Sequence, residues 1–549
     1  MYILGLNLLH DTSAALLNNG HIIGAVEEER FNRVKHTDSF PKHAISWLLS
    51  QAKISIIDVD KVVLSFDIEK FKNNDQPFEQ NTIYHDDRSE LGKQWILRDN
   101  HATYERLLQE LHWYGINSWE VVPHHLAHAG GAYYLSGFKE ANVLVIDGRG
   151  ETNGTSIFKV IDGQFTKLQD YSVFDSLGHV YTYATYLAGL YTDIGQEGKT
   201  MGLAPFGKKV PELYKQFHQI IRYQGDRYSV DRQKLYELDK LLENPGSLGS
   251  QSKLLAYQVQ KLYEEVLTFL AKKVYAKTKI ANYALAGGVS LNCEGNRALY
   301  DLPFVKQLFI QPAANDGGTA LGAAIFWATQ HNIKFSTPEN KVYLGPSFSN
   351  EQIKAILDRN QLNYQYIHEP ERLVAKYLAQ KKVVGWFQGR MEYGPRALGN
   401  RSILANPQNL DMKKRLNVDI KLLENWRPFA PSVLEEDADQ YFENFSTAGN
   451  FAYMTVSFNT KKSMRKQIPG ATNIDGTARI QVVSAQSNPK YHQLLKEFKK
   501  LTGVSALLNT SLNNHEPIVC TPEDAIRTFY ASVLDVLFMS NYLLMKKVS

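Results

Sequence analysis

Residues 121–151 read VVPHHLAHAGGAYYLSGFKEANVLVIDGRGE and combine two patterns on which the rest of the chain depends. His124 and His128 are four residues apart, so on a helix their imidazoles share one face, about one turn apart, as ligands of one metal ion do. The apolar run 143–146 then places Asp147 at the carboxyl end of a strand, where open α/β sheets bind ligands. A polar helix start before an ordinary core strand explains the same letters, so this stretch leaves both interpretations open.

The order of strand, polar turn and hairpin occurs twice in the chain. The apolar strand 1–9 ends at His10 and Asp11 and leads into two apolar runs joined by the turn 18–20, Asn-Asn-Gly. The run 143–146 leads in the same way into two runs joined by Asp-Gly at 162–163. Such turns between apolar runs are typical of β-hairpins, and the repeat predicts a duplicated half-domain. Duplicated sheets of this kind resemble the actin, sugar-kinase and Hsp70 fold.

Further strand ends carry polar or small residues. The run 283–286 is followed by Gly287 and Gly288, a turn at which backbone can approach a phosphorylated ligand. The run 309–312 is followed by NDGGTALGAA, with Asp316 just past the strand. Asp316 therefore joins the aspartates that end the two repeated strands, as expected of residues that line one ligand-binding cleft.

Composition indicates a cytoplasmic globular protein of more than one domain. The 549 residues have a net charge of +4 with basic and acidic side chains interspersed, which does not favour nucleic acid as a partner. Only two cysteines are present, in no metal-ligand pattern, which fits a reducing compartment. There is no leader-like start and no apolar run of membrane-spanning length, so we expect no membrane association.

A polar stretch with a Pro and a Gly, residues 335–345, predicts a linker between domains at 1–340 and 346–549. In the second domain, several cationic residues stand beside prolines, glycines or β-type residues, namely Arg390, Arg396, Arg401, Lys421, Arg427 and Arg479. Arginine forks bind phosphates and carboxylates in bidentate fashion, although any one of them is as easily explained by a surface ion pair.

Several motifs stand together in the order of one known family: HDTSAAL, AVEEERFNRVKH, HHLAHA, VLVIDGRGE, GKTMGLAPFG, AGGVSLN, NDGGTALGAA, FQGRMEYGPRALG, NWRPFAP and NTSLN. They resemble the NodU/CmcH-type O-carbamoyltransferases from residue 5 to residue 517. The resemblance implies an α/β protein with a duplicated actin-like (ASKHA) domain, similar to the transferase of tRNA threonylcarbamoylation. A C-terminal α+β domain similar to the YrdC fold would follow.

The family's reaction implies ATP and carbamoyl phosphate as substrates, with Mg²⁺ accompanying ATP. Carbamoyl-adenylate forms in the C-terminal domain, and its carbamoyl group then passes to a hydroxyl of a small molecule in the N-terminal domain. The acceptor, a natural product such as an antibiotic, a toxin or a sugar, is not identified, and residues 65–120 are expected to shape its pocket. The oligomeric state also stays open, with a homodimer among the options.

The resemblance also implies site residues. A divalent metal, iron(II) in the family, is expected on His124, His128, Asp147 and Asp316. Contacts to the adenylate or to carbamoyl phosphate are expected from Lys35, Gly288, Asn292, Arg396, Lys421, Arg427, Arg479, Asn509 and Ser511. Leu423 departs from the family pattern, in which an arginine often stands at this position.

Two residues, His10 and Lys35, are expected to take part in catalysis. His10 is the only side chain at the first strand's turn that titrates near neutral pH, so we interpret it as the general base, with a capping or core histidine as the alternative. Lys35 lies in the charged stretch EEERFNRVKH (27–36). Composition alone predicts that this stretch forms a solvated helix face. The resemblance instead implies that Lys35 lies beside the adenylate in the transfer cleft.

Two other functions fit parts of the sequence. A nucleotide-gated actin-like scaffold would share the fold, but His10, the metal set and the arginines disfavour it. A hydrogenase-maturation carbamoyltransferase would share both domains, but it carries zinc-finger cysteines that this chain lacks.

Overall fold

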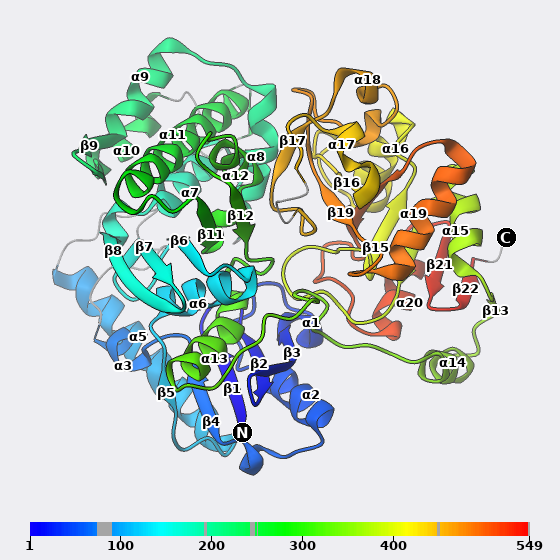
Figure 1. Ribbon diagram of the computed structural model, residues 1–549, viewed down its shortest axis with the longest axis horizontal. Coiled ribbons are helices and arrows are strands. Elements are labelled where there is room, and N and C mark those ends of the chain that lie inside the picture. Colours follow the sequence, from blue (N-terminus) through cyan, green and yellow to red (C-terminus); the bar gives the residue numbers. More distant parts are fainter. Residues whose placement is uncertain (74–89, 192–194, 242–247, 250, 447–450, 547–549) are drawn as a thin grey trace. The chain divides into compact units, whose positions relative to one another are not determined.

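The computed structural model describes residues 1–73, 90–191, 195–241, 248–249, 251–446 and 451–546 (Figure 1). The chain divides into two compact units. Unit 1 comprises Met1–Glu29 and His36–Pro338, and unit 2 comprises Arg30–Lys35 and Glu339–Ser549. The six residues 30–35 thus group with the C-terminal unit, although the chain on either side of them belongs to unit 1.

Unit 1 contains two five-stranded sheets of identical topology, in the orders β3-β2-β1-β4-β5 and β8-β7-β6-β11-β12. The strands of the first are β1 (Tyr2–Asn7), β2 (Ser13–Asn18), β3 (His21–Glu27), β4 (Lys61–Leu64) and β5 (Glu120–Val121). The strands of the second are β6 (Glu140–Ile146), β7 (Asn153–Ile161), β8 (Gln164–Ser172), β11 (Asn282–Ala286) and β12 (Gln307–Ile310). Each sheet has three antiparallel strands followed by two parallel ones.

The two hairpin turns explain why the repeat was visible in the sequence. Asn19 and Gly20 have φ angles of 48° and 77°, and Asp162 and Gly163 have 45° and 78°. Positive φ at both central residues is what a twisted two-residue hairpin needs, and Asn, Asp and Gly tolerate it best. The duplicated actin-like fold expected from the sequence is confirmed by this shared topology.

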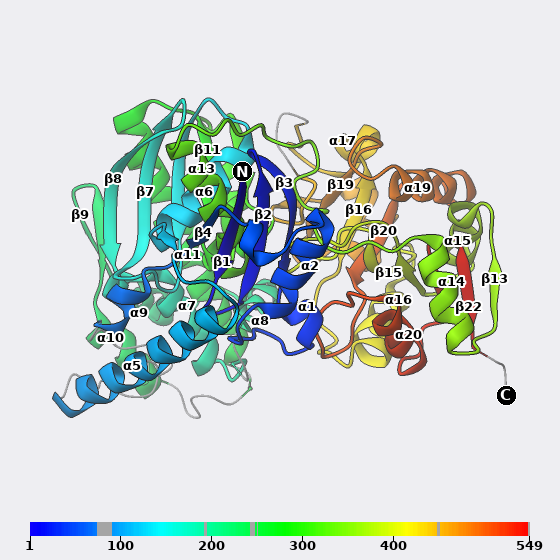
Figure 2. The same cartoon turned by 90° about the horizontal axis from the view of Figure 1, so that it is seen from below.

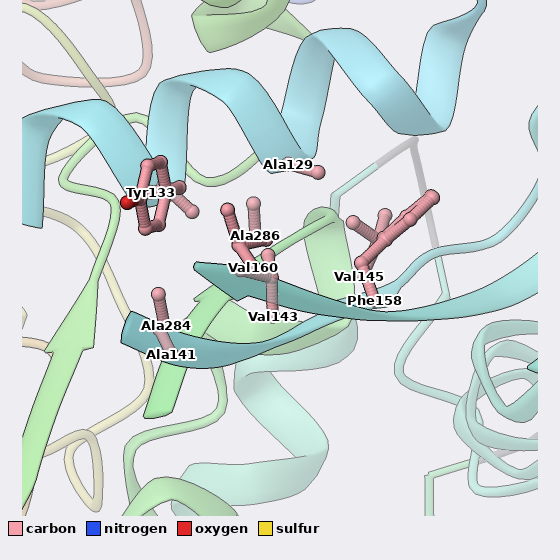
Figure 3. Packing of buried hydrophobic residues seen from close by; sticks show 10 residues of the cluster. Ala129, Tyr133, Ala141, Val143, Val145, Phe158, Val160, Ala284 and Ala286 are labelled. Atoms are coloured by element: carbon pink, nitrogen blue, oxygen red, sulfur yellow. The ribbon is translucent and has the colours of Figure 1, made fainter. Parts of the chain in front are cut away.

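Two helices link the sheets of unit 1. Helix α6 (His124–Ser136) packs on β6, β7 and β11, helix α13 (Thr319–Gln330) packs on β1, β2 and β4, and the helices pack on each other. Figure 3 shows Ala129 and Tyr133 of α6 above Val143, Val160 and other side chains of the sheet. Because alanines occupy several of the contact positions, the helix lies close to the strands.

Close packing also joins the helices to each other. A Cβ added at Gly322 of α13 would stand 2.0 Å from the carbonyl oxygen of Ala127 in α6. Gly130 is similarly crowded by the side chain of Phe326. These glycines hold the amino ends of α6 and α13 in a fixed relation, and that relation places the side chains of the candidate metal site.

The other helices of unit 1 pack on its strands or on one another (Figure 2). They include α2 (Lys42–Ala52), α5 (Glu90–Trp113), α7 (Leu177–Leu187), α8 (Glu197–Leu203), α9 (Pro211–Ile220), α11 (Ser252–Thr278) and α12 (Cys293–Tyr300). Of residues 65–120, expected to shape the acceptor pocket, 74–89 lie outside the described residues. Among the described residues, no helix combines the length and apolar character needed to cross a bilayer.

The charged stretch 27–36 is not the solvated helix that its composition favours. Only Glu29–Asn32 is helical (α1), and Glu27, Glu28 and Arg30 are buried. Glu28 accepts hydrogen bonds from the backbone nitrogens of His43 and Ala44. A carboxylate there satisfies the open amides at the start of α2, whose N-cap residue is a proline without a capping side chain.

Unit 2 is built on a mixed eight-stranded sheet in the order β13-β22-β21-β14-β15-β20-β16-β19. Its strands are β13 (Tyr364–Tyr366), β14 (Val384–Phe387), β15 (Arg401–Ala405), β16 (Ala430–Leu434), β19 (Gln481–Val483), β20 (Ala506–Ser511), β21 (Val536–Met539) and β22 (Tyr542–Met545). Helices include α14 (Asn350–Arg359), α15 (Pro370–Ala379), α19 (Pro489–Thr502) and α20 (Pro522–Tyr530). This α+β arrangement agrees with the class expected for the C-terminal part.

Two arginines of unit 2 donate hydrogen bonds to backbone carbonyl oxygens. The fully buried Arg401 donates to the carbonyl oxygens of Gln388, Asn400 and Pro346 at 2.6–3.0 Å. Arg390 donates to the carbonyl oxygen of Leu344. Both side chains therefore fix the loop between β14 and β15, and sequence alone could not separate this role from phosphate binding.

Candidate functional site

Four side chains converge at one end of unit 1. His124 and His128 come from the first turns of α6, Asp147 follows β6, and Asp316 precedes α13. One ligand atom from each lies within 4.8 Å of the others. The structure therefore brings together all four residues that the sequence proposed as metal ligands.

The spacing of these atoms fits a single cation. The Nε2 atom of His124 is 3.3 Å from Asp147 Oδ2 and 3.6 Å from Asp316 Oδ1, and His128 Nε2 is 3.5 and 3.6 Å from the same oxygens. Around a tetrahedral ion with bonds of about 2.0–2.2 Å, ligand atoms stand about 3.3–3.6 Å apart. Two imidazoles and two carboxylates suit a divalent transition metal such as iron, manganese or zinc.

Outer contacts hold these ligands in place. His124 Nδ1 donates to the carbonyl oxygen of Ser65 at 3.3 Å, so that Nε2 faces the other ligands. The second oxygen of Asp147 accepts from the backbone nitrogen of Gly288 at 3.0 Å. Glu151 accepts from the backbone nitrogen of His124 at 2.9 Å and supplies the cap that Pro123 cannot. Such second contacts orient metal ligands.

The two carboxylates of this cluster are in their charged form. Burial opposes the charged form of Asp147, but the hydrogen bonds and charges of His124 and His128 outweigh it, so the pKa of Asp147 lies well below its usual value. The pKa of Asp316 is lowered as well, with burial and the charge of Asp147 opposed by the histidines. Both carboxylates are therefore ionised at neutral pH, as metal coordination requires.

Sequence reasoning missed His125, the middle histidine of HHLAHA. It is buried, and its Nδ1 donates to Ser156 Oγ at 2.7 Å, while Ser156 donates to Asp170. Burial and the neighbouring charge of His124 lower the pKa of His125 to about 3, so it stays neutral. It anchors the first turn of α6 to β7, and the doubled histidine was the signal available in the sequence.

His10, the expected base, lies after β1 with its side chain 38% exposed. Its Nδ1 is 3.3 Å from Asp11 Oδ2, and its ring stacks on that of His36. Asp11, which the strand-end pattern grouped with Asp147 and Asp316, is not among the four clustered ligands. It accepts instead from the side-chain amide of Asn315 at 2.7 Å.

The glycine turn and Asn292 have clear structural roles. Gly287 has φ 89°, and a Cβ there would stand 2.3 Å from the carbonyl oxygen of Ile146. Asn292 caps α12 through Gly295 and exchanges two hydrogen bonds with Gln260. Asn292 thus has a structural role in this region, and Gly288 donates its backbone N–H to Asp147; the ligand contacts expected of both residues stay predictions.

Unit 2 holds a cluster of cationic side chains. Lys421 is buried, and its ammonium donates to the carbonyl oxygens of Ser511 and Asn513 at 3.0 and 2.8 Å. Burial and the charges of Lys35 and Arg427 lower the pKa of Lys421 to about 7. The lysine follows a single π-helical turn, Arg415–Ile420, a feature frequent at functional sites.

Arg427 extends this cluster. Burial lowers its pKa, the charge of Glu424 raises it, and the charge of Arg479 lowers it further. Lys421, Arg427 and Arg479 therefore form a continuous series of neighbouring cations that favours an anionic ligand. Arg396 lies half-buried in the loop between β14 and β15. Leu423, where an arginine was expected, is partly exposed and donates its backbone N–H to Asn417.

Lys35 joins the same unit, because the segment around it is anchored there. Arg33 donates to the carbonyl oxygen of Ile518 at 2.8 Å and pairs with Glu516 at 3.2 Å. Phe31 packs on Met391, Ile518 and Cys520. Lys35 itself is exposed. The structure therefore groups Lys35 with the cationic cluster of unit 2, and its contact with the adenylate, implied by the resemblance, stays a prediction.

Asn509 and Ser511 lie on strand β20. Asn509 is buried and donates to Ser432 Oγ at 3.1 Å and Gln481 Oε1 at 2.8 Å. Ser511 donates to Asn513 Oδ1 at 2.7 Å, beside the ammonium of Lys421. Ser511 thus lies beside Lys421, and Asn509 precedes it by two residues on the same strand; a contact of either residue with a ligand stays a prediction.

Two family models match most of the chain. The family model for the carbamoyltransferase N-terminus matches residues 2–325, and that for the carbamoyltransferase C-terminus matches residues 375–546. Among solved structures, full-length HypF in its phosphate- and nucleotide-bound form has a TM-score of 0.36 at 13% identity, covering 61% of this chain and 47% of that chain.

Curated relatives align along most of the chain. Nodulation protein NolNO of Sinorhizobium fredii is 34% identical over 555 residues, which cover 98% of this chain and 80% of the relative. Nodulation protein U of Rhizobium fredii is 28% identical over 548 residues, covering 93% and 89%. With both family models matched in chain order, the chain belongs to the carbamoyltransferase family, as its motifs predicted.

Proposed function

We propose that the chain is an ATP-dependent O-carbamoyltransferase. Unit 2 would form carbamoyl-adenylate from carbamoyl phosphate, water and ATP. Hydrolysis of carbamoyl phosphate gives carbamate and phosphate, and a carbamate oxygen then attacks the α-phosphorus of ATP with release of pyrophosphate. Unit 1 would pass the carbamoyl group to a hydroxyl of a small molecule, a natural product, toxin or sugar, and release AMP. The observation that carries the proposal is the four-ligand cluster of unit 1 in a chain whose other unit holds a series of cations, one buried and two half-buried.

In unit 2, Lys421, Arg427 and Arg479 would bind the phosphates of ATP and carbamoyl phosphate. The charge of Arg427 contributes to the lowered pKa of Lys421, and the charge of Arg479 contributes to the lowered pKa of Arg427, so an anion bound beside them would relieve the repulsion. The rigid placement of Lys421 by the carbonyl oxygens of Ser511 and Asn513 supports a positioning role.

In unit 1, His10 would take the proton of the acceptor hydroxyl while the hydroxyl oxygen attacks the carbamoyl carbon. A divalent ion on the four ligands would supply a Lewis acid for the negative charge of the departing AMP. We propose iron(II), following the family resemblance, although the donor set also suits manganese or zinc. The buried thiols of Cys293 and Cys520 are compatible with a cytoplasmic enzyme.

Transfer can be tested with a panel of polyols, aminoglycosides and sugar nucleotides. The chain is incubated with ATP, Mg²⁺, carbamoyl phosphate and iron(II), and products are analysed by mass spectrometry. We expect a mass gain of one carbamoyl group on a hydroxyl of at least one class of acceptor. Carbamoylation of an amine instead of a hydroxyl would contradict the assignment as an O-carbamoyltransferase.

A further inference from the structure

Unit 1 contains a second cluster of ionisable side chains, apart from the four metal-ligand candidates. The carboxylate of Asp11 lies between two histidines. Its Oδ1 atom is 2.8 Å from His36 Nδ1, and its Oδ2 atom is 3.3 Å from His10 Nδ1. The two imidazole rings are stacked, with centroids 5.6 Å apart and planes inclined by 20°.

Each histidine presents the same ring nitrogen to the carboxylate. Because Nδ1 faces Asp11, a neutral His10 carries its proton on Nδ1 and keeps a lone pair on Nε2. The two rings differ in access. A Cβ added at Gly195 would stand 2.7 Å from His36 Nε2, so backbone covers that edge of His36. The side chain of His10 is 38% exposed as a whole, although its Nε2 atom is itself buried, so an acceptor hydroxyl would reach that atom only after a small movement of its surroundings.

We propose that Asp11 and His36 are positioning residues for His10, in a His36–Asp11–His10 relay that fixes its tautomer and sets its basicity. This inference rests on the proposed role of His10 as the base for carbamoyl transfer. The acceptor hydroxyl gives its proton to His10 Nε2, and its oxygen bonds to the carbamoyl carbon. The bond from that carbon to the phosphate oxygen breaks, and AMP leaves with the electron pair. The charge on the imidazolium is balanced by Asp11.

His36 contributes a charge to this cluster. Burial alone would lower its pKa, but the hydrogen bond and charge of Asp11 and the charge of Glu29 outweigh burial and raise it. The pKa of Asp11 is held well below its usual value, since His10 and His36 outweigh its burial. The raised pKa favours the cationic form of His36, which offsets part of the carboxylate's charge, so Asp11 stabilises the imidazolium of His10 less than it would alone.

One ligand atom of each of His10, Asp11 and His36 lies within 4.8 Å of the others, a spacing that a cation could also bridge, but the contacts of Asp11 favour hydrogen bonds. The histidines meet different oxygens of Asp11, whereas a shared ion would draw both nitrogens towards one point. Asn315 also donates its amide to Oδ2 at 2.7 Å, which occupies a lone pair that a cation would need. A carboxylate with three donors around its two oxygens is a typical orienting group.

Two variants each remove one charge of the cluster with little change to the backbone. Asp11 and His36 both have φ 52°, a left-handed conformation that asparagine tolerates better than most residues. Asp11→Asn removes the negative charge next to His10, and His36→Asn removes the positive one. The relay predicts opposite effects of these two variants on the pKa of His10, while a merely structural cluster does not.

The direct test is a histidine NMR titration of the full chain. The protein is labelled with ¹³Cε1-histidine, and the His10 signal among the 16 histidines is assigned with His10→Gln. We expect Asp11→Asn to lower the pKa of His10 by about one unit or more, and His36→Asn to raise it. Shifts in the same direction, or no shift in either variant, would overturn the relay. His36→Asn alone still decides the sign if Asp11→Asn does not fold.

Two further measurements separate this inference from the proposed function. Release of AMP from carbamoyl-adenylate, with water as acceptor, should have an acidic limb that moves up in pH for His36→Asn and down for Asp11→Asn. Carbamoyl-phosphate-dependent exchange of pyrophosphate into ATP should stay unchanged in both variants. Absence of exchange in the parent would refute the proposed function, while the NMR result judges the relay. Loss of a bound metal in His36→Asn would make the cluster a metal site and refute the relay.

Discussion

Lys421 offers a quantitative test of the cationic cluster in unit 2. Its burial, with Lys35 and Arg427 nearby, lowers its pKa to about 7. An ammonium in contact with phosphate is stabilised, so binding of ATP should restore the charged form. At a free pKa of about 7, roughly a tenth of Lys421 is deprotonated at pH 6, half at pH 7 and nine tenths at pH 8. Binding should therefore take up about 0.1, 0.5 and 0.9 proton at these pH values.

The direction of the pH dependence of ATP binding follows from this coupling between proton binding and ATP binding. The free protein holds fewer protons than the complex above pH 7, so the affinity for ATP should fall as pH rises through that value, approaching about tenfold per pH unit. Calorimetric titration with Mg-ATP, without carbamoyl phosphate, in buffers of different ionisation enthalpy measures the uptake. Lys421→Met removes the group and serves as the control. Proton release in the parent, or a pH-independent affinity between pH 7 and 9, would refute the role of Lys421 as a phosphate ligand.

Three substitutions test other parts of the site. His128→Ala should lose most of the bound metal and of the carbamoyl transfer while keeping its circular dichroism spectrum, and unchanged metal content would contradict the ligand assignment. Arg427→Ala should abolish adenylate formation, because alanine cannot hold phosphate, and near-normal pyrophosphate exchange would count against it. Lys35→Ala should slow single-turnover transfer by about 10²–10³ if Lys35 contacts the adenylate, whereas a rate within about twofold of the parent would make it a surface residue.

The duplicated fold of unit 1 could be predicted because its signals are local. Each sheet begins with a strand, a polar turn and a hairpin, and the hairpin turns use Asn, Asp and Gly where positive φ is needed. The metal ligands could be predicted for a related reason. His124 and His128 share a helix face, and Asp147 and Asp316 each follow a strand of the same sheet.

Other features depend on contacts between distant residues and could not be predicted in the same way. Arg401 stands in the same glycine- and proline-rich context as Arg396, and only its burial against carbonyl oxygens identifies it as structural. Asn292 carried a family role, but its pairing with Gln260 depends on how α11 packs. Asp11 and His36 are 25 residues apart, and nothing in the intervening letters indicates that their side chains meet.

The central claim is that one chain both makes and uses carbamoyl-adenylate, and isotope exchange tests the first half of it most directly. Purified chain is incubated with Mg-ATP and labelled pyrophosphate, with and without carbamoyl phosphate, for the parent, Arg427→Ala and His10→Gln. We predict label in ATP only when carbamoyl phosphate is present, full exchange in His10→Gln and none in Arg427→Ala. Exchange that does not need carbamoyl phosphate, or that is lost in His10→Gln while Arg427→Ala retains it, would contradict the proposed division of labour between the two units.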